Sequence, residues 1–267
     1  MKKLVLALTV ALVTVACATT TSPTGRTQYV GAVSQEQLNQ LGAQAFTQMK
    51  GEQRVAGGQQ STYLSCVVNA LVRELPADQR QIAWEAAVFV DDSPNAFALP
   101  GGKVGVNTGL FTVARDQHQL AAVVAHEIGH VIASHHDERI TRQMSAQTGV
   151  GLVGAVVGSR YGEGASQTAS QLSGAAAQGL FLLPNSRVQE TEADVVGQDL
   201  MARAGFDPRK AVDLWQNMIG AGGSRPPEWL STHPNPESRI SELQARAAGL
   251  VPVYEQARAS GRTPNCD

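Results

Sequence analysis

The chain has 267 residues, of which 43% are apolar and 16% charged, and its net charge is −2 at pH 7. This composition supports a sizeable hydrophobic core and excludes a chain that is disordered throughout. Nucleic-acid-binding domains gather Lys and Arg on one face, so the near-neutral charge argues against a nucleic-acid partner. The length fits one domain after an N-terminal targeting segment.

The first residues have the order of a bacterial export signal. Lys2 and Lys3 precede an apolar run over residues 4–16, which is too short to anchor a chain across a bilayer, and Cys17 follows a small residue. This order resembles a lipoprotein signal, in which the cysteine becomes the lipidated first residue. We therefore expect a signal peptide over residues 1–16 and an outer-membrane lipoprotein that faces the periplasm and touches the membrane only through its lipid. An ordinary signal peptide with an incidental cysteine is the alternative.

A Thr-, Ser-, Pro- and Gly-rich segment over residues 17–27 is typical of a tether. Apolar residues at helical spacing then predict helices over residues 34–50 and 59–75. Residues 82–90 have the character of a strand, and a turn cluster follows at residues 91–95.

Two short strands, residues 96–99 and 103–107, flank Pro-Gly-Gly and predict a hairpin. The rest of the chain is mostly helical, so we expect a mainly helical α+β fold with a small hairpin or sheet. Two cysteines remain after Cys17, and an exported chain can join them, so we expect a Cys66–Cys266 disulfide. Two free thiols are the alternative.

The helix over residues 119–134 carries the sequence His-Glu-Ile-Gly-His. Asp116 can cap this helix, with Gln119 as its capping-box partner. His126 and His130 are four residues apart, so both rings leave one face of the helix and can reach a single zinc ion. Glu127 lies beside that face, where its carboxylate can reach a water on the metal without being a ligand.

A catalytic zinc takes three protein ligands and leaves one position open. The candidates for the third ligand are four other histidines and the downstream carboxylates: His118, His135, His136 and His233, and Glu190, Glu192 and Asp194. His135 and His136 lie just beyond the motif helix, where we expect them to face solvent.

Glu190 is the strongest candidate for the third ligand. It shares one face of a later helix with Asp194, which can accept a hydrogen bond from the far nitrogen of a ligating histidine, His126 by preference. Ala193 and Gly197 are small, so this helix can approach the motif helix closely. Glu192 points elsewhere, and we expect it to be solvated. The alternative is that all three carboxylates lie on a solvent-exposed face of the helix and bind no metal.

Taken together, the motifs resemble the HtpX and CAAX prenyl protease family of zinc metallopeptidases, the gluzincins, and within it the soluble periplasmic lipoprotein branch. The resemblance rests on five stretches and extends over roughly residues 24–248: residues 126–130, 190–194, 95–102, 231–240 and 24–26. It implies a gluzincin-type metalloprotease domain over residues 28–250, with the hairpin beside the active-site cleft, one Zn²⁺ per chain and a tail over residues 251–267.

The resemblance also implies roles for single residues. His233 is placed at the zinc, either as a fourth ligand of a latent state or as an oxyanion stabiliser, and Arg239 is the other candidate for stabilising the oxyanion. Substrate is expected to add as a strand to the hairpin edge formed by Asn95, Ala96, Phe97 and Ala98. The Gly- and Ala-rich residues 148–183 resemble a lid or plug over the active site; a flexible loop that points away is the alternative.

The expected activity is therefore zinc-dependent hydrolysis of peptide bonds in misfolded or unassembled envelope proteins. Polypeptides are the expected partners. The rival interpretation is a chaperone or assembly factor for outer-membrane proteins in which proteolysis is secondary.

Overall fold

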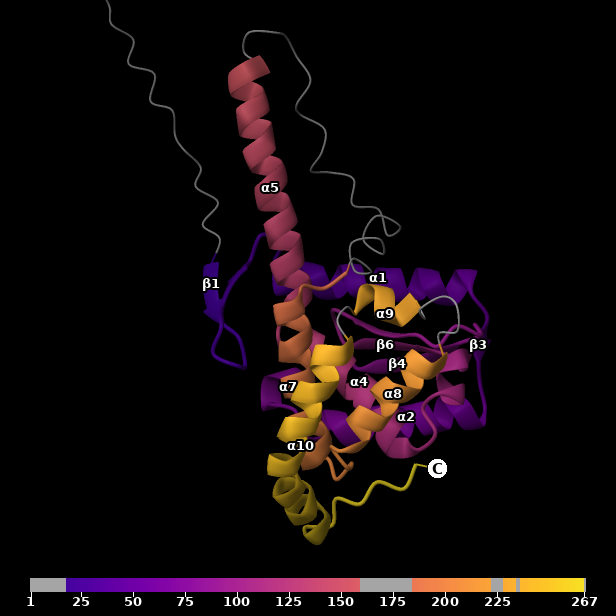
Figure 1. Cartoon of the computed structure of the whole chain (residues 1–267). Coiled ribbons are helices and arrows are strands. Elements are labelled where there is room, and N and C mark those ends of the chain that lie inside the picture. The colour runs from indigo at the N-terminus through magenta and orange to yellow at the C-terminus, as the bar shows by residue number, and fades with distance from the viewer. Residues whose placement is uncertain (1–17, 159–183, 222–227, 234–235, 267) are drawn as a thin grey trace, which may run out of the picture.

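A computed structural model describes residues 18–158, 184–221, 228–233 and 236–266. The expected signal peptide, Cys17 and most of the expected lid, residues 159–183, lie outside the described residues. The mainly helical α+β fold is confirmed (Figure 1). In the part of the chain that the structure describes, no helix combines the length and the hydropathy that a bilayer crossing requires.

The chain begins with an antiparallel hairpin of β1 (Ala18–Thr21) and β2 (Thr27–Val30). The segment expected to be a tether, residues 17–27, forms most of this ordered hairpin in its described part. Its polar side chains bond to distant helices: Gln28 Nε2 donates to the carbonyl of Ala133 over 2.7 Å, and Arg26 pairs with Glu138. The hairpin is therefore part of the folded domain.

Helices α1 (Gln35–Glu52) and α2 (Gln59–Val72) confirm the two helices expected from apolar spacing. Ser34 starts α1 with a complete capping box. The short elements β3 (Val55–Ala56) and α3 (Ala77–Arg80) flank α2.

A four-stranded sheet has the order β3-β4-β6-β5. It contains β4 (Glu85–Phe89), β5 (Ala96–Leu99) and β6 (Lys103–Asn107). Strands β4 and β6 are parallel, and β5 pairs antiparallel with β6 as the expected hairpin. Strand β5 forms one edge of this sheet, which matters for the site described below.

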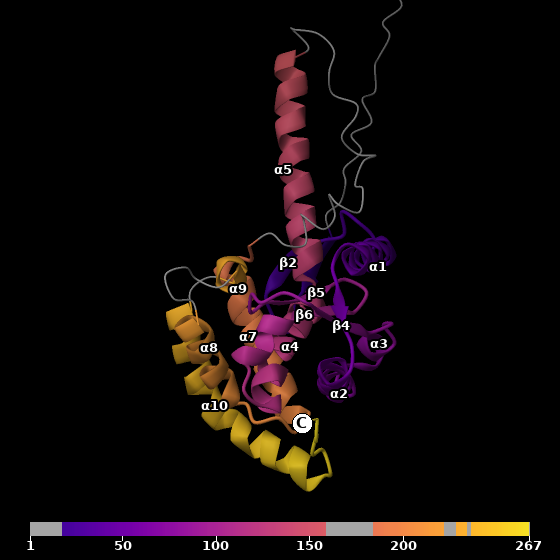
Figure 2. The same cartoon turned by 90° about the vertical axis from the view of Figure 1, so that its right-hand side faces the viewer.

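Helices α1 and α2 lie on one side of the sheet, and α4, α7, α8 and α10 lie on the other (Figure 2). The remaining elements follow in chain order: η1 (Thr108–Thr112, a 3₁₀ helix), α4 (Gln117–Ile132), α5 (His135–Gly158), α7 (Arg187–Arg203), α8 (Lys210–Ala221), α9 (Glu228–Thr232) and α10 (Pro236–Ala259). Helix α5 includes residues 148–158 of the expected lid, and its far end extends away from the body in both views (Figures 1 and 2). Helix α10 runs to Ala259, so the expected tail begins inside a helix.

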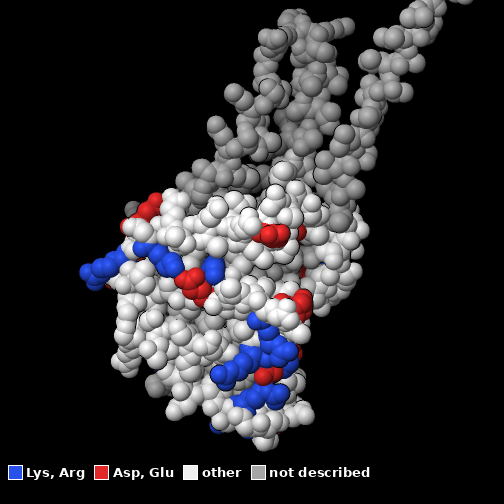
Figure 3. Space-filling model, turned by 180° about the vertical axis from the view of Figure 1, so that it is seen from behind, with Lys and Arg blue, Asp and Glu red and all other residues white. Residues whose placement is uncertain are grey.

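The main core lies between α2, the sheet, α4, α7 and α8. A smaller cluster joins α1 to the sheet through Phe46, Phe89 and Phe97, whose rings lie 5.8–6.4 Å apart. Cys66 on α2 and Cys266 near the C-terminus form a disulfide. The face seen from behind carries Lys and Arg side chains with Asp and Glu among them, on a largely uncharged surface (Figure 3). Surface ion pairs of this kind contribute little to stability.

Candidate metal centre

Helix α4 begins where the Asp116 side chain accepts a hydrogen bond from the backbone N–H of Gln119. The expected capping box is incomplete, because the Gln119 side chain accepts from the backbone N–H of Arg115 rather than from that of Asp116. Gln119 Oε1 also accepts from Asn217 of α8 over 3.0 Å. The cap therefore fixes the start of the motif helix against a neighbouring helix.

The rings of His126 and His130 leave the same face of α4, as the spacing predicted. Both residues are buried, and their Nε2 atoms are 3.1 Å apart. Two ligands at about 2.05 Å from one zinc ion and at a tetrahedral angle would be about 3.3 Å apart. The two nitrogens therefore have the separation of neighbouring ligands. Burial lowers the pKa of His126 to about 4 and that of His130 well below its ordinary value, so both rings are neutral at pH 7 and can ligate a cation.

Glu190 of α7 faces both nitrogens. Its Oε2 atom is 3.6 Å from His126 Nε2, and its Oε1 atom is 3.5 Å from His130 Nε2. The side chain is fully buried, and Oε1 has no hydrogen-bond partner among the described residues. Burial raises the pKa of Glu190 to about 8. A buried carboxylate oxygen without a partner, facing two bare ring nitrogens, fits a bound cation.

The two helices approach closely because small residues face each other. A Cβ on Gly129 would meet the Ala193 carbonyl oxygen at 2.9 Å, and a Cβ on Gly197 would meet the backbone nitrogen of His126 at 2.8 Å. No side chain larger than hydrogen fits at either glycine without movement. The expected close contact between the two ligand-bearing helices is therefore present.

Asp194 holds the ring of His126 from behind. Its Oδ1 atom is 2.9 Å from His126 Nδ1, which places the ring proton on Nδ1 and leaves Nε2 bare toward Glu190. Although burial opposes ionisation, the charge of Arg239 holds the pKa of Asp194 below its ordinary value.

Arg239, which the resemblance made a candidate for stabilising the oxyanion, is bonded to two carboxylates of α7 in the structure. Its Nε and Nη2 atoms each donate to Asp194 over 2.6 Å, and Nη1 donates to Glu190. The guanidinium is buried against the ring of Trp215. Nη2 also lies 3.2 Å from His126 Nδ1, so Arg239 positions both carboxylates beside the ring of His126.

Glu127 lies next to the metal-facing group with its carboxylate buried. Its Oε1 atom accepts from Trp229 Nε1 over 3.0 Å and lies 3.3 Å from His233 Nε2. Burial raises the pKa of Glu127 to about 8, against the opposing effects of the hydrogen bond from Trp229 and the charge of Arg239. A carboxyl that changes protonation near neutral pH is suited to general-base chemistry.

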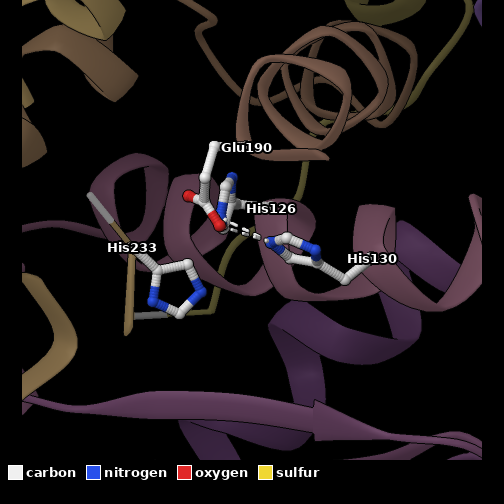
Figure 4. A group of neighbouring side chains, drawn as sticks. All are labelled: His126, His130, Glu190 and His233. Carbon is white, nitrogen blue, oxygen red and sulfur yellow. Dashed lines mark hydrogen bonds and ion pairs between the residues drawn. The ribbon is translucent and has the colours of Figure 1, made fainter. Parts of the chain in front are cut away.

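His233 joins the group from the segment after α9 (Figure 4). One ligand atom from each of His126, His130, Glu190 and His233 lies within 4.8 Å of all the others. His233 Nδ1 is 3.0 Å from the carbonyl of Trp229 and 2.9 Å from Oγ1 of Thr232, and its Nε2 is 3.3 Å from Glu127 Oε1. With the ring proton on Nδ1, Nε2 can ligate a cation; with the proton on Nε2, the ring can donate to Glu127 or to an oxyanion.

Strand β5 is an edge strand of the sheet and packs against α4, which carries two of these side chains. The backbone N–H of Asn107 in β6 donates to the carbonyl of Asn95, and Phe97 lies opposite Gly105, so the backbone groups of Ala96 and Ala98 point away from β6. The substrate edge expected from Asn95, Ala96, Phe97 and Ala98 stays a prediction, and residues 96–98 are buried in the described conformation.

Three expectations about nearby residues are wrong. His135, His136 and Glu192 are buried instead of solvated. His135 lies between His130 and Glu192, at 2.8 Å and 3.1 Å respectively. His118 is placed away from the metal-facing group, where its Nδ1 accepts from the backbone N–H of Asp207.

Trp229 is a site residue that the sequence analysis missed. Its indole stacks on the His233 ring with centroids 4.7 Å apart and donates to Glu127. The signal was present in the sequence, because Trp229 and His233 are four residues apart and share a face of any helix that contains them.

Comparisons with known proteins agree with this geometry. The pattern of peptidase family M48 matches residues 58–247. Mitochondrial metalloendopeptidase OMA1 of Schizosaccharomyces pombe is 36% identical over 184 residues, which are 68% of this chain and 51% of the relative. Beta-barrel assembly-enhancing protease of Escherichia coli K12 is 32% identical over 203 residues, which are 73% of this chain and 41% of the relative. The chain thus matches about half, or less, of the length of these curated relatives.

Proposed function

Since the chain belongs to peptidase family M48, we propose that it is a zinc-dependent endopeptidase with His126, His130 and Glu190 as the metal ligands. The observation that carries the proposal is the buried, partnerless oxygen of Glu190, which faces two neutral rings at ligand-like separations. Two nitrogens and one carboxylate are the donor set of several catalytic zinc sites. Calcium and magnesium prefer sites made wholly of oxygen, so the donor set favours zinc over them.

Glu127 is the proton-transfer group of the proposed reaction. A zinc ion in this site would supply a Lewis acid, which polarises the scissile carbonyl and lowers the pKa of water to about 7. The Glu127 carboxylate takes the proton of the attacking water and returns it to the amine that leaves. Asp194 keeps the proton of His126 on Nδ1, and Arg239 keeps Asp194 ionised, so the ligand set holds its protonation through the reaction.

The free edge of β5 is the proposed substrate-binding surface. A polypeptide in extended form can pair with the outward backbone groups of Ala96 and Ala98, next to Glu127. Main-chain pairing of this kind gives affinity with little dependence on side chains. It suits a peptidase that acts on unfolded chains of varied sequence.

The described conformation is proposed to be closed. Trp229 and His233 both contact Glu127 Oε1, and all three side chains are buried. His233 also offers a ring nitrogen within 4.8 Å of a ligand atom of each of His126, His130 and Glu190. We therefore assign His233 to the fourth position of a latent state, and α9 must move before a polypeptide reaches Glu127.

The biological setting is proposed from the N-terminal sequence together with one group of relatives. The lipoprotein-like order around Cys17 and the similarity to a bacterial protease named for β-barrel assembly support quality control of envelope proteins at the outer membrane. The similarity to mitochondrial endopeptidases is as strong, so the relatives alone do not favour the bacterial envelope. The export signal is therefore the main support for this setting. Mass spectrometry of the mature N-terminus tests the setting: an unmodified Cys17, or a chain that still begins at Met1, would contradict it.

The proposed activity is tested by metal content and cleavage together. Purified wild-type protein should contain about one zinc per chain and cleave a denatured protein substrate, while Glu190→Ala should lose both. If Glu190→Ala retained full zinc and full activity, the third ligand would lie elsewhere. A wild-type protein that prevents aggregation of an unfolded outer-membrane protein without cleaving any chain would favour the assembly-factor interpretation.

A further inference from the structure

The two metal-facing histidines of α4 are supported in different ways. His126 meets a carboxylate directly, because Asp194 accepts from its Nδ1 and is itself bound by Arg239. His130 meets no carboxylate on that side; its Nδ1 lies 2.8 Å from Nδ1 of His135. The group that determines the protonation of His130 must therefore be sought beyond His135.

The carboxylate behind His135 is Glu192. Its Oε2 atom lies 3.1 Å from Nε2 of His135. A carboxylate only accepts, so the proton of the neutral His135 ring is on Nε2 and its Nδ1 carries a lone pair. This lone pair accepts from Nδ1 of His130, and Nε2 of His130 is then left bare toward Glu190. Each hydrogen bond in this series therefore determines the direction of the next one.

Glu192 is held by the N-terminal hairpin. The Thr24 hydroxyl donates to its Oε1 atom over 2.6 Å, and the Nε and Nη2 atoms of Arg26 donate to Oε2 over 3.0 and 2.8 Å. Arg26 is fixed in turn by two bonds to Glu138 of α5, at 2.7 and 2.9 Å. Gln189 also donates to Glu138. These donors hold Glu192 as a carboxylate, which can only accept the hydrogen bond from His135.

We propose that Thr24 and Arg26, through Glu192 and His135, form a hydrogen-bonded relay that sets the ring tautomer and the orientation of the metal ligand His130. The proposal rests on the proposed metal site. It makes His135 and Glu192 positioning residues, and it makes the N-terminal hairpin a part of the metal centre although more than 160 residues separate Arg26 from Glu192. Each metal-facing histidine of α4 is then backed by a carboxylate that an arginine holds, directly for His126 and through one further ring for His130.

The relay is tested at its two ends in the purified protein. His135→Leu removes the acceptor for His130, whereas His135→Asn keeps an amide oxygen near the position of Nδ1. Arg26→Met removes the donors to Glu192 and keeps an unbranched side chain of similar length. Arg203→Met is the matched control, because Arg203 bonds to Asp199 and to the Glu74 carbonyl, apart from the relay.

The first readout is the zinc dissociation constant, measured by competition with a chelator. Loss of a group that orients a ligating histidine typically weakens metal binding about 10–100-fold. We expect a loss in this range for His135→Leu, a clear recovery in His135→Asn, a loss of at least severalfold for Arg26→Met and wild-type affinity for Arg203→Met. Wild-type affinity in both His135→Leu and Arg26→Met would overturn the relay, and equal losses in Arg26→Met and Arg203→Met would overturn the role of the hairpin.

The second readout needs no metal. Two-dimensional NMR of the metal-free protein, labelled with ¹⁵N in its histidines, reports which ring nitrogen of His130 carries the proton. We expect the proton on Nδ1 in the wild type and in His135→Asn, and a mixture of tautomers in His135→Leu. A wild-type ring with its proton on Nε2 would contradict the relay. A wild type that shows the expected tautomer but binds no zinc would contradict the proposed metal site and leave the relay supported, so the two failures are distinct.

Discussion

Replacement of Gly197 by alanine should push the two ligand-bearing helices apart. A Cβ at this position would lie 2.8 Å from the backbone nitrogen of His126 and 2.9 Å from the carbonyl group of Ala125. These are backbone atoms of α4, so they cannot rotate away as a flexible side chain could. Ordinary contact begins at 3.4 Å, so α4 and α7 must separate by about 0.6 Å, the difference between 3.4 and 2.8 Å.

The separation should affect metal binding more than stability. Overpacking costs about 1–3 kcal/mol, and the better helix propensity of alanine offsets up to about 1 kcal/mol. The free energy of unfolding should therefore fall by about 0–2 kcal/mol, and Tm by about 2–4 °C for each kcal/mol. Ligand distances tolerate only about ±0.2 Å, so moving Glu190 by about 0.6 Å should weaken zinc binding on the order of tenfold or more.

Zinc affinity is measured by competition with a chelator, and stability by urea unfolding of the metal-free protein. The control is Gly249→Ala in α10, where an added Cβ would meet no atom within 4 Å. This control should gain about 0.5–1 kcal/mol of stability and keep its zinc affinity. Wild-type zinc affinity in Gly197→Ala would refute the claim that the helix spacing sets the ligand geometry.

Four further predictions follow from the structure. Burial raises the pKa values of Glu127 and Glu190 to about 8, so between about pH 4.5 and 8 the metal-free folded protein binds more protons at these groups than the unfolded chain does. Below about pH 6.5 the lowered pKa of His126 has the opposite effect. The free energy of unfolding should therefore fall as pH rises from about 6.5 to 8. Zinc binding at pH 7 should release protons, so the heat of binding measured by calorimetry should depend on the ionisation enthalpy of the buffer. Equal heats of binding in different buffers would contradict this. Replacing both cysteines of the Cys66–Cys266 disulfide by alanine should lower the free energy of unfolding by about 2–5 kcal/mol, whereas two reactive thiols in the unreduced protein would reject the bridge. His233→Ala should raise cleavage of a denatured substrate if His233 closes the site, and a large fall with zinc retained would assign it to the transition state instead.

The ligand-bearing faces of α4 and α7 could be predicted because they follow from local periodicity. His126 and His130 are one helical turn apart, as are Glu190 and Asp194, and the small residues opposite them permit close packing. These relations need only the helix geometry and one partner helix. The hairpin of β5 and β6 was likewise expected from the turn residues around Pro100, whereas its place at the edge of the sheet was implied only by the resemblance.

Glu192 could not be placed by the same argument. Periodicity put it on the face of α7 turned away from α4, and such a face is usually solvated. In the structure the N-terminal hairpin covers that face through Thr24 and Arg26. A contact between segments this distant in sequence leaves no mark in the local pattern, so a composition typical of a tether hid an ordered hairpin.

His135 and His136 were misplaced for a different reason. The expectation that they face solvent assumed that the chain leaves the body after α4. Ser134 instead has a positive φ of 54°, which turns the chain so that α5 starts at once and folds its first turn back against the site. Residues other than glycine rarely take this conformation, so a serine at position 134 does not predict the turn.

Cleavage by Glu127→Gln is the most direct test of the central claim, that this site hydrolyses peptide bonds with Glu127 as the base. The substitution keeps the size of a side chain that is not a ligand, so zinc content should stay near one per chain. The rate of cleavage of a denatured protein should fall by about 10²–10⁴-fold relative to the wild type. Wild-type cleavage by a zinc-loaded Glu127→Gln protein would contradict the account.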